Sequence, residues 1–230
     1  MRKVSPESVR DDFRAELQAL TNFHRLGVTA FANESDRSTL TEHSLIAVAV
    51  AWEGFVNDMF IAYINRDATR FKEHLKKSVE MQLVAPRPKR VFASYGDLAF
   101  PKHLKKHDIE ALADSAGGNI TFPNFKELEA KAKVWLTSAH AAKFSGLTLQ
   151  QKAVINAVVA LRNHLAHRSK RSGDAMNRAL AAGTLQGTGI KRADNRVLYV
   201  GAWLKATPPR FQETRFSLLV QILDGIGATF

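Results

Sequence analysis

The amino-acid sequence predicts an all-α protein, and three observations lead to this prediction. Apolar residues recur at helical spacing near both ends of the chain, at Phe13, Leu17 and Leu20 and again at Phe216 and Leu219. Hydroxyl or amide residues stand in helix-capping positions before several such segments. A strand pattern is confined to one short stretch near the C-terminus. An up-and-down helical bundle is therefore the predicted architecture.

The first quarter of the chain predicts two long helices. Ser5 precedes a proline and an acidic residue, a pattern typical of a helix start, and the helix is expected to span about residues 6–31. Thr39 has Glu42 three residues later, which is a capping-box pattern and predicts that the second helix begins there. Apolar residues cover almost every face from this point to about residue 65. We therefore expect the second helix to be central and buried.

The middle of the chain has a less regular pattern. Short helices joined by basic loops are expected at about residues 67–120, as an insertion between bundle helices. Asn124 then predicts the cap of another helix. Thr148 and Gln151 form a second capping-box pattern, and the helix that starts there is expected to end near Arg168.

A C-terminal extension is expected at about residues 172–230. Its pattern predicts a short helix over residues 174–182 and a terminal helix over residues 211–226 that returns to the bundle. Between them, two short runs flank a turn dipeptide and predict a small β-hairpin within residues 190–204. Because no linker divides the chain, residues 1–230 are expected to form a single domain.

Composition narrows the range of partners and chemistries. Lys and Arg number 33 and Asp and Glu number 22, so the formal net charge is +11 and polyanions such as nucleic acid are favoured. The chain has no cysteine, which excludes disulfides, thiolate nucleophiles and iron–sulfur clusters. No metal-ligand spacing or glycine-rich phosphate loop is present. The expectation is a protein without a metal or another cofactor.

The expected location is the cytoplasm, without a membrane partner. The N-terminus becomes acidic and amphipathic where a secretory signal needs a continuous apolar region. The longest apolar run, residues 45–52, is far shorter than the roughly 20 residues that span a bilayer.

A cluster of polar residues interrupts the apolar helix near residue 160. Asn163 and His167 are four residues apart and share a face, so the amide can hold one tautomer of the imidazole. Arg162 lies about 140° from His167 around the helix axis, and the two flank a groove. A guanidinium that binds phosphate beside an imidazole suits phosphodiester chemistry without a metal. The alternative is structural, because cations at a helix end complement the macrodipole.

Glu53 also needs an explanation. It is the only formally charged residue between Glu42 and Asp58, in the most apolar helix. A carboxylate there is costly without a partner. Either it forms a buried pair with a cation such as Arg162, or it lines a polar groove.

The residues of this cluster resemble the signature of the HEPN superfamily. The resemblance rests on Arg162 followed by Asn163, with His167 five positions after the arginine, late in an apolar helix. The stretch 51–58 is similar to the aromatic and acidic patch on the partner helix of bacterial HEPN proteins. The resemblance covers roughly residues 39–169. It implies a HEPN-type bundle that dimerises with its motif helices facing each other.

The resemblance also implies an activity. Many members of the superfamily are metal-independent ribonucleases, so we expect an endoribonuclease that uses the ribose 2′-hydroxyl as nucleophile, as a toxin or a phage-defence effector. RNA, a second copy of the chain and an antitoxin or other regulatory protein are the expected partners. The expected catalytic residues are Arg162, which holds the phosphate, His167, which transfers protons, Asn163, which orients that histidine, and Glu53. The expected nucleic-acid-binding residues are Arg168, Lys170, Arg171, Lys89 and Arg90.

The alternative function is a non-catalytic helical module. It would bind RNA, a nucleotide or an acidic partner protein through its positive surface, and the residues of the motif would then be structural.

Overall fold

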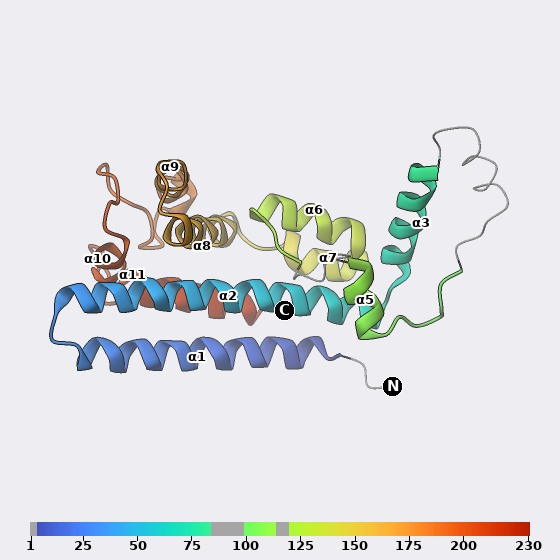
Figure 1. Ribbon diagram of the computed structural model, residues 1–230, viewed down its shortest axis with the longest axis horizontal. Helices are drawn as coiled ribbons and strands as arrows, with labels where there is room; N and C mark the ends of the chain where they lie inside the picture. Colours follow the sequence, from blue (N-terminus) through green and yellow to red (C-terminus); the bar gives the residue numbers. More distant parts are fainter. Residues whose placement is uncertain (1–3, 84–98, 114–119) are drawn as a thin grey trace.

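The computed structural model describes residues 4–83, 99–113 and 120–230, and every regular element in these ranges is helical (Figure 1). The predicted all-α class is confirmed. In chain order the elements are α1 (Pro6–Ala30), α2 (Glu34–Arg66), α3 (Thr69–Leu83), α5 (Lys106–Ala113), α6 (Phe125–Trp135), α7 (Ser138–Ser145), α8 (Leu149–His167), α9 (Lys170–Leu180), a 3-10 turn η1 (Gly183–Leu185), α10 (Val200–Lys205) and α11 (Arg215–Gly227).

The long hairpin of α1 and α2 forms the base of the fold. The predicted cap of α1 is confirmed, since the Ser8 amide donates to Ser5 Oγ at 3.3 Å. The predicted start of α2 at Thr39 is wrong, because Asn33 caps the helix and α2 begins at Glu34. The Thr39 hydroxyl instead donates to the carbonyl of Ser35 inside the helix. The polar first turn of α2 remains helical because Asn33 supplies the earlier cap.

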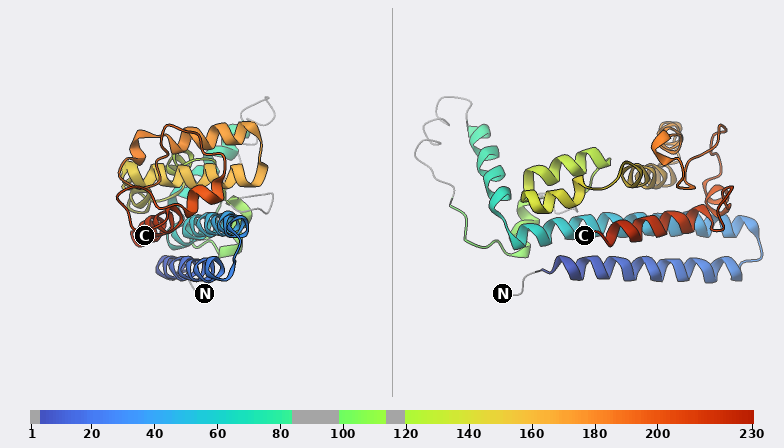
Figure 2. Two further views of the ribbon diagram at one scale, coloured as in Figure 1. Left: turned by 90° about the vertical axis from the view of Figure 1, so that its left-hand side faces the viewer. Right: turned by 180° about the vertical axis from the view of Figure 1, so that it is seen from behind.

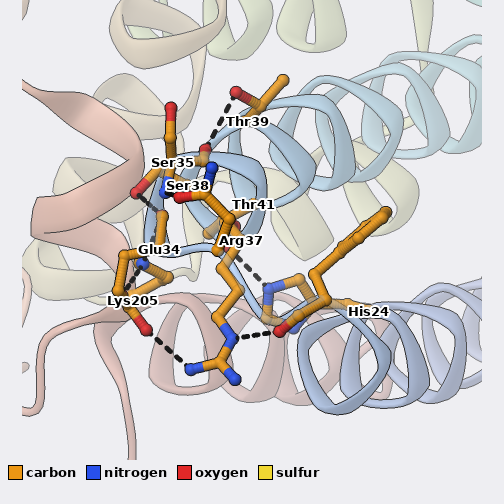
Figure 3. A network of polar contacts seen from close by, with 10 residues as sticks. His24, Glu34, Ser35, Arg37, Ser38, Thr39, Thr41 and Lys205 are labelled. Atoms are coloured by element: carbon orange, nitrogen blue, oxygen red, sulfur yellow. Dashed lines mark hydrogen bonds and ion pairs between the residues drawn. The ribbon is translucent and has the colours of Figure 1, made fainter.

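A polar network closes the turn between α1 and α2 (Figure 3). Arg37 donates from Nε to the Phe31 carbonyl at 2.7 Å and from Nη1 to Glu34 at 2.6 Å. Lys205 of α10 also donates to Glu34, so the C-terminal part of the chain is tied to the same turn. Hydrogen bonding by Lys205 and Arg37 lowers the pKa of the Glu34 carboxyl.

The helices form three layers. Seen along the hairpin, α1 lies at one side, α2 and α11 share the middle, and α8 and α9 lie across the other side (Figure 2). The phenyl rings of Phe13 and Phe55 stack at 4.3 Å between α1 and α2. Helix α2 is long and apolar enough to cross a membrane, but 61% of its most apolar window is buried against other helices. It therefore has the burial of a central core helix.

The predicted C-terminal hairpin is wrong: residues 190–199 have an irregular backbone without a strand. Side chains satisfy this backbone in place of a second strand. The Asn177 amide donates to the Val197 carbonyl at 3.2 Å and accepts from the Val197 amide at 2.8 Å. Arg192 donates to the carbonyls of Ala193 and Asp194, both at 2.7 Å. The second predicted strand, residues 197–200, is irregular as far as Tyr199, and Val200 begins α10.

The insertion is helical in its described parts. Helix α3 is anchored by buried Phe71, and α5 is anchored by buried Ile109. Lys89 and Arg90, two of the expected nucleic-acid-binding residues, lie outside the described residues.

Candidate active site

Helix α8 places the polar cluster at its C-terminal end. The predicted capping box is confirmed: the Gln151 amide donates to Thr148 Oγ1 at 3.2 Å, and the Thr148 amide donates to Gln151 Oε1 at 2.8 Å. Buried apolar side chains fix the orientation of the helix; they are Ala153, Val154, Ile155, Ala157, Val158, Val159, Leu161 and Leu165. Their burial leaves Arg162 and Asn163 half-buried and His167 exposed. The helix ends at His167, one residue before the predicted end.

Glu53 of α2 and Arg162 of α8 form an ion pair. Arg162 Nη2 lies 3.5 Å from Glu53 Oε2, and their side chains are 32% and 24% exposed. The distance is long for a charge-assisted hydrogen bond, and Glu53 accepts no hydrogen bond from any described residue. The pair is thus partly solvated and weakly bonded, which agrees with a polar groove better than with a sealed core pair.

Glu53 also borders a small apolar pocket between α2 and α8. Trp52, Val56, Ile155 and Val159 contribute to its lining. Apolar walls on one side lower the local dielectric, so a charge bound near this pair interacts more strongly than it would in open water.

Asn163 contacts Arg162 in place of the expected histidine. Its Oδ1 accepts from Arg162 Nη1 at 3.2 Å, and no described contact joins Asn163 to His167. The expectation that Asn163 orients His167 is therefore not met in this structure. The physical reason is that the neighbouring guanidinium competes for the amide oxygen, while His167 projects from the last residue of the helix.

The two histidines of the cluster have different surroundings. His167 is exposed and makes no hydrogen bond or ion pair with the described part of the chain. His164 is half-buried, and its Nδ1 lies 3.3 Å from Ser172 Oγ of α9. Its ring also packs against Gly173, where an added Cβ would lie 3.3 Å from the imidazole. His164 therefore joins α8 to α9, whereas His167 is free to meet a ligand.

Arg168 is fixed by contacts that the sequence did not reveal. It caps α8 with φ 46°, and its Nη2 donates to Glu42 Oε2 at 2.8 Å. Glu42 Oε1 accepts from the backbone amide of Gly201 at 3.0 Å, so one carboxylate joins α2, α8 and α10. Gly201 fits only without a Cβ, which would lie 2.2 Å from the Ser38 carbonyl oxygen. No local sequence signal could have identified Glu42, because it lies 126 and 159 residues from these partners.

Cations gather where α8 ends and α9 begins. Ser169 caps α9, and exposed Lys170 and Arg171 occupy its first turn, which has no acidic residue. Positive charge at a helix N-terminus opposes the macrodipole and destabilises a free helix end. Lys170 and Arg171 are exposed cations within four residues of His167 in the chain, which suits a polyanion.

A scan against protein-family models, a search of curated proteins and a search of solved structures give no match to this chain.

Proposed function

We propose that the protein is a metal-independent endoribonuclease of HEPN type. The observation that carries the proposal is the weakly bonded Glu53–Arg162 pair. Its arginine lies at the same end of α8 as a run of cations and the exposed His167, which has no hydrogen-bond or ion-pair partner among the described residues. A guanidinium with free donors and an imidazole that can accept or donate a proton are sufficient groups for phosphodiester cleavage.

The proposed reaction is an intramolecular transesterification, in which the bond from phosphorus to the 5′-oxygen is replaced by a bond to the 2′-oxygen. The ribose 2′-oxygen attacks the adjacent phosphorus while His167 accepts the hydroxyl proton. The bond from phosphorus to the 5′-oxygen breaks, and the leaving oxygen takes up a proton. The products are a 2′,3′-cyclic phosphate and a 5′-hydroxyl, so DNA is not a substrate.

Arg162 stabilises the phosphate in this mechanism. Its contact with Glu53 is 3.5 Å long, and among the described residues only Asn163 forms a hydrogen bond with the guanidinium. The remaining N–H groups are available to two phosphate oxygens in a bidentate geometry. We assign Asn163 as a positioning residue for Arg162, and Glu53 as the carboxylate that limits where the guanidinium moves.

A dimer supplies the second proton-transfer group. One imidazole cannot accept and donate a proton at the same moment, whereas two copies of His167 in a shared groove divide the two roles. Helix α2 offers a surface for the second copy: Val50 is 52% exposed, and a Cβ added at Gly54 would meet no atom within 4 Å. Val50 and Gly54 are four positions apart and share one helical face, and Glu53 directly precedes Gly54.

Gly54 allows a test of this dimer surface. In an isolated subunit, Gly54→Ala should stabilise α2 by about 0.5–1 kcal/mol, because glycine is unfavourable inside a helix. Gly225→Ala is the matched control, since Gly225 is also helical and also has open space around its Cα. If copies meet at Gly54, only Gly54→Ala should weaken a dimer of 25.5 kDa subunits in ultracentrifugation. Equal effects of both variants on the dimer would argue against this surface.

The non-catalytic module remains a distinct second function, and one observation favours it. No described residue fixes the tautomer of His167, as the orienting partner of a general base usually does. Under this function RNA binds with a steep salt dependence and stays intact.

The deciding experiment incubates purified protein with single-stranded RNA in excess chelator. Wild type should produce 2′,3′-cyclic phosphate ends, and Arg162→Ala and His167→Ala should each lower the rate by about 100-fold or more. His103→Ala is the control, because this histidine is exposed on the insertion. Intact RNA with wild type, or equal rates for all variants, would overturn the proposal.

A toxin or phage-defence role, with an antitoxin-like partner, is part of the proposal that follows from the resemblance.

A further inference from the structure

Two large apolar side chains project into solvent near the candidate site. Tyr199 is 78% exposed and Leu198 is 72% exposed, and within the described residues no large apolar side chain exceeds Tyr199. Single exposed apolar side chains are common on protein surfaces, and on a flexible loop they carry no functional information. The backbone that carries these two residues is instead tightly held on both sides.

The preceding residue is fixed to α9. The Asn177 side chain bonds both the amide and the carbonyl of Val197, at 2.8 Å and 3.2 Å, and Asn177 is buried. A further ion pair between Arg196 and Asp174 ties the same segment to α9. The direction in which Leu198 leaves Val197 is thereby determined.

The following residues are fixed to α2. Val200 is 2% exposed, and the Gly201 amide donates to Glu42 at 3.0 Å. The backbone of Gly201 lies so close to Ser38 that no side chain fits between them. Tyr199 is therefore presented by a preorganised loop, which lowers the entropic cost of binding a ligand through its ring.

The same contacts connect Tyr199 to the positive end of the motif helix. Glu42 accepts from Gly201 through one oxygen and from Arg168 through the other, so the loop and the C-cap of α8 share one anchor. Arg168 is followed by exposed Lys170 and Arg171. An exposed aromatic ring beside a track of cations is the arrangement that binds single-stranded nucleic acid: the cations hold the backbone and the ring stacks a base.

We propose that Tyr199 is a base-stacking residue for single-stranded RNA, with the exposed cations Lys170 and Arg171 binding the adjoining phosphates. This inference rests on the proposed function for the identity of its ligand. It adds a binding residue outside the cleavage motif and restricts the substrate to RNA with an unpaired base.

RNA suits the patch better than a protein partner does. A stable protein interface buries about 800 Å² on each side. Here two apolar side chains lie next to several cations, which gives charge complementarity to phosphate within a small area.

The test measures RNA affinity separately from cleavage. Fluorescence anisotropy with a short labelled single-stranded RNA is recorded in the His167→Ala background, which keeps the RNA intact. Tyr199→Ala should weaken binding by about 5- to 150-fold, and Tyr199→Phe should stay within about twofold of its parent, because stacking needs the ring and not the hydroxyl. Leu149→Ala is the matched control: Leu149 is also 72% exposed but lies at the opposite end of α8.

Several results would overturn the inference. The first is an unchanged RNA affinity in Tyr199→Ala. The second is a loss of affinity in Tyr199→Phe as large as that in Tyr199→Ala, and the third is an equal loss for fully paired RNA. The fourth is a change in oligomeric state with an unchanged RNA affinity per folded molecule. The last result would indicate a protein contact. Failure of the proposed function gives a different pattern: wild type then binds RNA through Tyr199 but leaves it intact. Active cleavage with normal binding by Tyr199→Ala would refute this inference alone.

Discussion

The Glu42–Arg168 contact and the Glu53–Arg162 contact both join α2 to the C-terminal part of α8, yet they are built differently. Glu42 accepts two hydrogen bonds, of 2.8 Å and 3.0 Å, one through each oxygen. Glu53 has a single ion pair at 3.5 Å. A fully bonded carboxylate fixes neighbouring elements, whereas an under-bonded pair leaves its guanidinium able to exchange partners. The first contact is therefore a structural junction, and the second is the contact at which we propose that a phosphate binds.

The largest expected loss of stability comes from a substitution that forces apart the backbones at the Glu42–Arg168 junction. Gly201→Ala places a Cβ against the carbonyl oxygen, carbonyl carbon and Cα of Ser38, at 2.2–2.9 Å. These are backbone atoms and cannot rotate away, so we expect a loss of about 3 kcal/mol or more in the free energy of unfolding. Urea denaturation measures it. Gly183→Ala serves as the control, because nothing lies within 4 Å of its added Cβ; equal stability of both variants would show that the junction is not tight.

The next effect compares the two glutamates directly. Glu42→Ala leaves the Gly201 amide and Arg168 without their acceptor, and should cost about 1–3 kcal/mol of stability. Glu53→Ala removes only a partly solvated pair and should cost about 1 kcal/mol or less. Thermal unfolding of the two variants at neutral pH gives the comparison. A larger loss for Glu53→Ala would reverse the assignment of the two sites.

A smaller loss of stability is expected when the pH is lowered, because the native state holds His24 neutral. Burial against Phe216 lowers the pKa of His24 below its ordinary 6.5. Its Nε2 lies 2.9 Å from Thr41 Oγ1, and because the Thr41 hydroxyl donates to the Arg37 carbonyl, His24 is the donor and carries its proton on Nε2. The unfolded chain therefore binds a proton more readily than the native one. Stability is fully present above pH 6.5 and falls as the pH drops below it.

This acid sensitivity distinguishes the two junctions, since Thr41 directly precedes Glu42 in α2. After correction for the slower intrinsic exchange at low pH, the protection of amides near Glu42 should fall below pH 6.5 before the protection of amides near Glu53 does. His24→Gln keeps an Nε2 donor but does not titrate, and should flatten part of the pH dependence. The rest persists because burial also lowers the pKa of His74 and His140. An unaltered pH profile in His24→Gln would exclude this histidine as a source.

The sequence was sufficient for features with local physical causes. The caps at Ser5 and Thr148 involve residues three apart, and both were predicted correctly. The partner of Glu53 was also foreseeable as one of two alternatives, because a charge within an apolar helix needs a counterion.

Features that depend on distant residues could not be predicted in this way. Glu42 matched a cap pattern but serves a contact 159 residues away. The hairpin pattern near Val197 was overridden because Asn177, 20 residues earlier, takes the hydrogen bonds that a second strand would have made. Helical spacing predicted that the Asn163 amide contacts His167. It could not show that the guanidinium of the adjacent Arg162 donates to the same amide oxygen instead.

The most direct test of the central claim is the cleavage of one RNA by Arg162→Lys and Arg168→Lys, at equal concentrations of folded protein. Lysine keeps the positive charge in both variants but loses the forked geometry that binds two phosphate oxygens. If Arg162 holds the scissile phosphate and Arg168 is mainly structural, Arg162→Lys should lower the single-turnover rate by about tenfold or more, and Arg168→Lys should stay within about threefold of wild type. Equal losses, or a larger loss in Arg168→Lys, would contradict the account.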